Sequence, residues 1–167
     1  MNGPALAAMI CRELRALERE LQAYKTEDQV WLVPPGLPNS GGTLALHAAG
    51  NLLHFIGAVL GGTSYVRDRD AEFSRRGVPR SELIEGLQQA SEVVTATLTA
   101  LDPARLEAPY PLPVLNRRLD TGDFIMHLAT HLAYHTGQVD FHRRIVTGDV
   151  AGVGAVSPTE LSTARTL

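Results

Sequence analysis

A chain of 167 residues is long enough to form one domain with a substantial buried core. Hydrophobic residues make up 44% of it and charged residues 20%, which is typical of a globular protein and excludes a largely disordered one. With 15 basic and 18 acidic side chains the formal net charge is −3, so we expect no basic surface for DNA or RNA and no nucleic acid as a partner.

Cysteine content and hydropathy favour a cytoplasmic protein. The single cysteine, Cys11, excludes an internal disulfide and fits a reducing compartment. The first residues lack a basic region followed by an apolar run, so no signal peptide is expected. The longest apolar run, 44–60, is interrupted by His47, Asn51 and His54, which favours a buried helix over a membrane span. We therefore expect no contact with a membrane.

Hydrophobic spacing predicts an amphipathic first helix over about residues 4–24. Its apolar side chains recur at three- and four-residue intervals: Leu6, Ile10, Leu14, Leu17 and Leu21. A connection rich in proline and glycine follows over 31–42. A second helix is predicted over about 42–60, with Asn39 or Ser40 as its N-cap. Its many alanines and glycines indicate the close approach of a neighbouring helix.

The second half of the chain begins with a charged segment, 65–79. Its composition favours a solvated connection with internal ion pairs; the alternative is a rim around a binding site or a subunit contact. Helical periodicity predicts a third helix over about 79–101 and a fourth over about 122–146. Since no alternating strand pattern occurs, we predict an all-α four-helix bundle over 1–148 and a C-terminal tail over 149–167.

All six histidines fall on the second and fourth predicted helices. They are His47, His54, His127, His131, His135 and His142. A lone histidine on an apolar helix is more often a hydrogen-bonded core residue than a ligand, but six on two helices favour metal binding. The motifs of other metal sites are absent from the sequence: neither His-Glu-x-x-His nor a glutamate three residues before a histidine occurs.

The fourth helix carries three imidazoles at four-residue spacing: His127, His131 and His135. Side chains four residues apart lie about 6 Å apart on one face of a helix, so neighbouring histidines can share one metal ion. The outer two, about 12 Å apart along the axis, cannot. A catalytic site with three protein ligands then needs His47 or His54 from the second helix. Spacing makes His131 a ligand in either pairing and leaves both other choices open.

Two segments resemble the DinB-like (YfiT-like) superfamily of metal-dependent bacterial proteins. They are Leu44-Ala-Leu-His47-Ala-Ala-Gly-Asn51 and His131-Leu-Ala-Tyr-His135-Thr-Gly-Gln138. The likeness extends over nearly the whole chain. It implies a four-helix bundle with a long crossover connection between the second and third helices, for which the charged segment 65–79 is suited.

The resemblance also selects the ligands. It implies one histidine early in the second helix and a pair that ends just before Gly-Gln in the fourth: His47, His131 and His135. The other three histidines then lie outside the metal site. Asn51 and Gln138, each about one turn from a ligand, are candidates to hydrogen-bond those ligands. His127 is a candidate accessory group or proton relay, although a buried, hydrogen-bonded histidine is the commoner alternative.

The activity implied by the resemblance is less specific than the site. Members of the superfamily bind a divalent ion such as zinc or nickel, many are homodimers, and some use a low-molecular-weight thiol. We therefore expect a thiol-dependent transferase or a metal-dependent hydrolase that acts on a small molecule. Two alternatives remain: a non-enzymatic bundle with a structural, metal-sensing or stress-related role, and a metal-free module for ligand binding or dimerisation.

Overall fold

The structure is a computed structural model that describes residues 2–155, 157–161 and 163–166. Four long helices form the predicted bundle, and the described residues contain no β-strand beyond isolated bridges. The long helices are α1 (Gly3–Gln22), α3 (Gly41–Leu52), α5 (Arg80–Ala100) and α7 (Thr121–Thr147). Short helices occupy the connections: α2 (Glu27–Trp31), α4 (Arg69–Ser74) and α6 (Ala104–Glu107).

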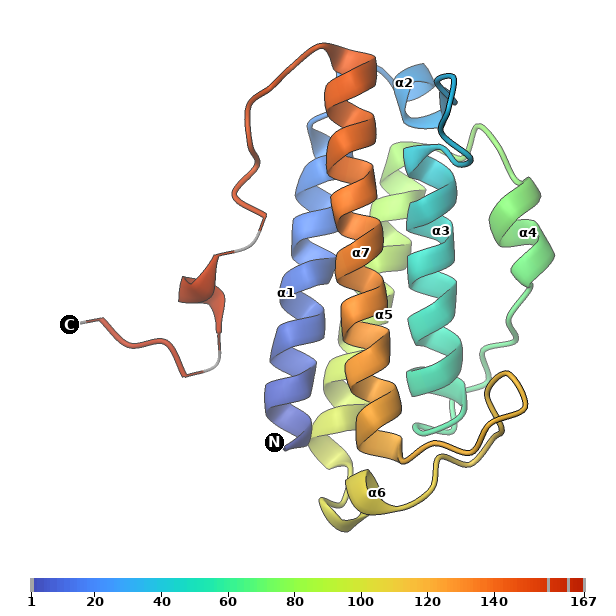
Figure 1. Cartoon of the computed structure of the whole chain (residues 1–167), viewed down its shortest axis with the longest axis vertical. Coiled ribbons are helices and arrows are strands. Elements are labelled where there is room, and N and C mark those ends of the chain that lie inside the picture. The colour runs from blue at the N-terminus through green and yellow to red at the C-terminus, as the bar shows by residue number, and fades with distance from the viewer. Residues whose placement is uncertain (1, 156, 162, 167) are drawn as a thin grey trace.

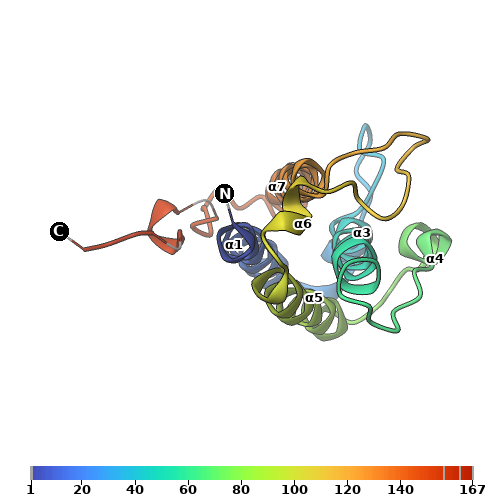
Figure 2. The same cartoon turned by 90° about the horizontal axis from the view of Figure 1, so that it is seen from below.

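The order of the helices around the core explains the long connection. Seen along the bundle axis, α1, α5, α3 and α7 follow one another around the core (Figure 2). The helices α1 and α7 run in one direction, and α3 and α5 run in the other (Figure 1). Because α3 and α5 are adjacent and parallel, the chain between them must return over the length of the bundle. It does so along the outer side of α3, where α4 lies, and this is the crossover that the family likeness implies.

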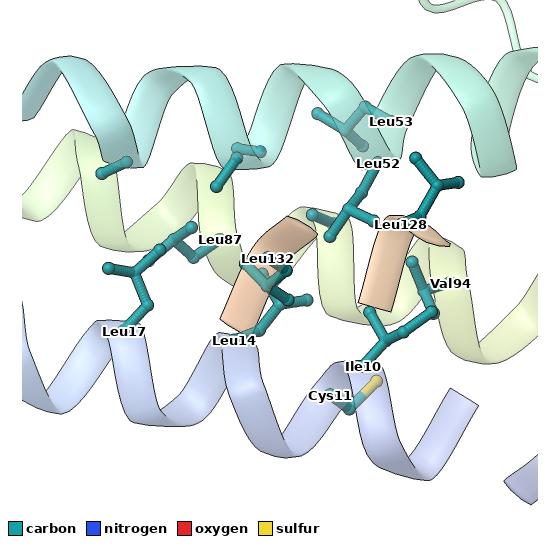
Figure 3. Packing of buried hydrophobic residues seen from close by; sticks show 14 of the residues in the cluster. Ile10, Cys11, Leu14, Leu17, Leu52, Leu53, Leu87, Val94, Leu128 and Leu132 are labelled. Carbon is teal, nitrogen blue, oxygen red and sulfur yellow. The ribbon is translucent and has the colours of Figure 1, made fainter. Parts of the chain in front are cut away.

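The core is built from one apolar stripe on each long helix (Figure 3). The predicted stripe of α1 is at most 2% exposed: Leu6, Ile10, Leu14, Leu17 and Leu21. Side chains of the other three helices meet it, among them Leu52, Leu87, Val94, Leu128 and Leu132. In the described part of the chain, no helix combines the length and apolarity that crossing a membrane requires.

The second predicted helix has the expected extent but changes its geometry halfway. Ser40 caps α3, since its hydroxyl accepts a hydrogen bond from the backbone N–H of Thr43. After Leu52 the helix continues as a π-helical segment, η1 (Leu53–Ala58). Helical periodicity cannot distinguish these two forms, because both present similar residues to the core over so short a stretch.

Glycines in this helix mark close contacts with two different neighbours. A Cβ atom at Gly57 would lie 2.7 Å from Val93 of α5, which confirms the predicted approach of another long helix. A Cβ atom at Gly50 would lie 2.3 Å from a carboxylate oxygen of Glu72 in α4. The second contact brings the crossover, and not a bundle helix, onto the outer face of α3.

The chain leaves the bundle after α7. Gly148 ends the helix in a left-handed conformation with φ of 68°, which glycine adopts without strain. The tail contains a short 3-10 turn, Pro158–Glu160. Arg15 and Arg19 of α1 both form ion pairs with Glu160, so this turn lies against the outer face of the first helix.

Candidate metal centre

Three imidazoles converge between α3 and α7. One nitrogen from each of His47, His131 and His135 lies within 4.8 Å of the other two. The ring of His47 is nearly perpendicular to the other rings, with centroids 5.3 Å from His131 and 5.1 Å from His135. The fold therefore brings together the three histidines that the family likeness selects, while His54 and His127 lie outside this group.

Gln138 orients His135. The Nδ1 atom of His135 lies 2.6 Å from Oε1 of Gln138, so Nδ1 carries the proton and Nε2 is left unprotonated. That Nε2 atom lies 3.1 Å from Nε2 of His131. This Nε2 accepts the hydrogen bond when His131 carries its proton on Nε2, and a cation can take the place of that proton. Ligand nitrogens around tetrahedral zinc are about 3.3 Å apart for bonds of about 2.0–2.1 Å, so these two nitrogens are spaced like ligands of one divalent cation.

Glu72, on the crossover, orients His47, and the sequence interpretation missed it. Its Oε2 atom lies 2.9 Å from Nδ1 of His47, and both side chains are almost fully buried. Arg67 holds the carboxylate with two donors, Nε at 2.7 Å from Oε1 and Nη2 at 2.9 Å from Oε2. The charged segment therefore contains the expected internal ion pair and also forms one wall of the site. Only its charge signalled this, since sequence spacing cannot predict a contact between positions 47 and 72.

Burial favours the neutral forms of His131 and His135, whereas hydrogen bonds keep Glu72 ionised. Burial lowers the pKa of His131 to about 4, and nearby positive charge from the other histidines and Arg67 acts in the same direction. Burial also lowers the pKa of His135, although its hydrogen bond to Gln138 opposes this. Burial raises the pKa of Glu72, but hydrogen bonds from Arg67 and His47 outweigh it, and the net pKa is below the ordinary value. Neutral imidazoles beside a carboxylate suit a divalent cation.

Asn51 and His127 were the other residues expected to take part in the site. Asn51 is buried on α3, but the side chain that accepts the hydrogen bond from Nδ1 of His47 is Glu72. His127 is exposed, so the alternative of a buried histidine is wrong. Its ring stacks on that of His131, with centroids 5.9 Å apart and 28° between the ring planes. It extends the row of imidazoles toward solvent without joining the converging group.

The remaining histidines contribute elsewhere in the fold. His142 is buried on α7, where its Nδ1 lies 2.6 Å from the hydroxyl of Tyr24 and its Nε2 lies 2.8 Å from the carbonyl of Leu32. Both of its nitrogens are thus used within the bundle. His54 is half-buried in η1 and packs edge-on against Phe55, with centroids 4.8 Å apart.

The chain matches one known protein family over the region that contains the site. A model of the DinB superfamily matches residues 7–139, which include the converging histidines and the crossover. No curated protein and no solved structure matches the chain significantly. Because the match extends over most of the chain and over the whole site, this helical protein belongs to the DinB superfamily.

Proposed function

We propose that the protein binds one divalent metal ion through His47, His131 and His135 and uses it in a reaction on a small molecule. The observation that supports this is the convergence of three imidazole nitrogens from two helices within 4.8 Å. Three protein ligands are typical of catalytic sites, which keep one coordination position for water or substrate. Imidazole ligands suit zinc or nickel, the two ions that we propose.

The reaction class that we propose is transfer of a low-molecular-weight thiol or hydrolysis. A divalent ion, when bound, acts as a Lewis acid and lowers the pKa of water or a thiol. The chain's own residues set the donor atoms: Gln138 accepts a hydrogen bond from Nδ1–H of His135, and Glu72 accepts one from Nδ1–H of His47. Both imidazoles therefore keep Nε2 free for the ion. Arg67 holds Glu72 in place for this.

Elemental analysis of protein purified without a histidine tag tests the proposed site. We expect one zinc or nickel ion per chain in the parent and none in the His131→Ala variant. The His54→Ala variant is the matched control, since His54 lies outside the converging group, and it should keep the metal. A parent protein that contains no metal and behaves like His131→Ala contradicts the proposal. Turnover of an electrophile with cellular thiols, compared with ester hydrolysis, then separates the two reactions.

A non-enzymatic structural or metal-sensing role is the second candidate. Its support is that the ligands join α3 to α7 while Glu72 joins the crossover to α3, so a bound ion stabilises three segments at once. It predicts a melting temperature that rises with zinc or nickel and no turnover with any thiol. A wide separation of His47 from His131 and His135 would have favoured the third alternative, a metal-free module, but the three histidines converge.

We further propose that the protein is a homodimer. Large apolar side chains are exposed along α7: Met126, Tyr134, Phe141 and Ile145. Their spacing puts them within one stripe of the helix, and such stripes on a protein surface mark interaction sites. Sedimentation velocity should give twice the chain mass for the parent and the single chain mass for Phe141→Glu.

A cytoplasmic location is also proposed. Cys11 is the single cysteine of the chain, and its thiol is buried near Thr95 of α5, at 3.3 Å from that hydroxyl. A buried thiol with no disulfide partner in the chain fits a reducing compartment. Cell fractionation followed by immunoblotting tests this location.

A further inference from the structure

We infer that Glu72 is a positioning residue of the metal site, which fixes the proton and the orientation of His47 so that Nε2 faces the other two imidazoles. The inference rests on the proposed metal binding and extends the site to the crossover, a segment that carries none of the expected ligands. Three features of the structure support it: the hydrogen bond to His47, the clamp formed by Arg67, and the gap left by Gly50.

The hydrogen bonds around His47 determine which nitrogen carries the proton. Nδ1 lies 2.9 Å from the Glu72 carboxylate and 3.4 Å from Nη2 of Arg67. A carboxylate only accepts and a guanidinium only donates, so one tautomer cannot satisfy both contacts. The shorter contact to Glu72 prevails, and Nδ1 carries the proton. In the opposite tautomer Nε2 is protonated and cannot bind a cation.

Glu72 is held in this place from two sides. Arg67 binds both carboxylate oxygens, so the carboxylate cannot rotate away from His47 without breaking two charge-assisted hydrogen bonds. Gly50 lies three residues after His47 on α3, and a Cβ atom there would lie 2.3 Å from Oε1 and 2.9 Å from Cδ of Glu72. The same helix thus carries the ligand and the gap into which the partner of that ligand fits.

Charge gives Glu72 a further effect on the ion. Three neutral imidazoles leave the charge of a divalent cation uncompensated within the ligand set. A carboxylate that accepts the Nδ1 proton of a ligating histidine makes that histidine a stronger donor, and losing such a partner commonly costs about 10–100-fold in metal affinity. A contact that merely ties α4 to α3 affects stability but neither the His47 tautomer nor the affinity for the ion.

Zinc affinity, measured at pH 7 by competition with a chromophoric chelator, tests the inference. We expect Glu72→Ala to bind zinc about 10–100-fold more weakly than the parent, with Glu72→Gln intermediate because its amide oxygen still accepts the Nδ1 proton. Gly50→Ala should lower the affinity similarly by displacing Glu72. Two matched controls should not change it: Glu82→Gln, an exposed carboxylate paired with Arg75, and Gly86→Ala, whose new Cβ meets only Ala49 at 3.9 Å.

The nitrogen-15 shifts of His47 in the metal-free protein provide a second readout. We expect the parent to show a proton on Nδ1 and Glu72→Ala to show it distributed over both nitrogens. The inference is overturned if that proton stays on Nδ1 in Glu72→Ala or if Glu72→Ala binds zinc as tightly as the parent. If the parent takes up no zinc, the proposed metal binding fails, and the His47 tautomer alone decides the inference. Should Gly50→Ala not fold, the Glu72 variants decide it.

Discussion

His135 and His142 lie two turns apart on α7, the first half-buried and the second fully buried, and they have different partners. His135 bonds Gln138 through Nδ1 and turns Nε2 toward His131. His142 uses both nitrogens within the bundle, and its Nε2 faces a carbonyl.

The two histidines therefore hold opposite tautomers. A carbonyl only accepts, so the Nε2 atom of His142 carries its proton and Nδ1 accepts from the hydroxyl of Tyr24. In His135 the proton is on Nδ1 and Nε2 is free. Burial alone does not separate the two kinds of histidine, because His47 of the converging group is buried as His142 is. What distinguishes His135 from His142 is whether the second nitrogen faces another imidazole or a backbone carbonyl.

The largest expected effect is on zinc affinity, when each of these two histidines is replaced in turn. His135→Ala removes a donor atom. Zinc affinity should therefore fall by more than about 100-fold, which is the upper end of the loss expected when only a hydrogen-bonding partner of a ligand is removed. His142→Leu should leave the affinity unchanged, because both nitrogens of His142 are occupied. Isothermal titration with zinc measures both variants. Equal losses in the two would show that the free nitrogen is not the distinguishing feature.

The same two substitutions should affect the free energy of unfolding in the opposite order. His142→Leu fills most of the same volume but leaves the Tyr24 hydroxyl and the Leu32 carbonyl without their partner. We expect a loss of about 1–3 kcal/mol in the free energy of unfolding for the metal-free protein, measured by urea denaturation. His135→Ala, whose ring is only half-buried, should lose less. The reverse order would contradict the assignment of His142 to the core.

A smaller effect is expected at Gln138, which hydrogen-bonds Nδ1 of the proposed ligand His135. Gln138→Ala removes a neutral acceptor, and we expect about tenfold weaker zinc binding, at the lower end of the range for such partners. Gln88→Ala is the matched control, because Gln88 is exposed on α5 and its amide donates to Glu18 of α1, away from the converging histidines. Competition with a chelator measures both. An unchanged affinity in Gln138→Ala would mean that packing alone orients His135.

The smallest effect is a pH dependence. Burial lowers the pKa of His142 below its unfolded value of about 6.5, although the hydrogen bond to Leu32 opposes this. Below that pH the unfolded chain binds more protons than the folded one, so stability is fully present above about pH 6.5 and decreases as the pH falls through the folded pKa. The metal-free His142→Leu variant should show a shallower decrease than the parent in urea denaturation between pH 7 and pH 4. A parallel decrease in both proteins would assign the dependence to the other buried histidines.

The bundle and the candidacy of His131 were within reach of the sequence because both depend on residues close in the chain. Apolar side chains three and four residues apart must share a face, and so must His131 and His135. The choices of His135 over His127 and of His47 over His54 came from the family likeness, because spacing alone allowed the other histidine equally well in both cases.

The positioning residues were harder to foresee for a physical reason. Glu72 lies in a segment whose charges are typical of a solvated connection, and its role depends on a fold that returns the chain along the outside of α3. Asn51 is one turn from His47, which made it the natural candidate, but the carboxylate that hydrogen-bonds Nδ1 of His47 is that of Glu72. The π-helical turn after α3 leaves no periodic signal of its own.

The distance along the chain between the converging histidines has a consequence for folding. One comes from the second long helix and two from the last, so residues 47 and 131, which are far apart in the chain, must come together. Closing so long a loop costs entropy that only the docked helices repay, and such contacts form late. During synthesis the site is incomplete until α7 has been made and has packed. A metal ion that binds there is thus captured by the finished protein and not by its precursor.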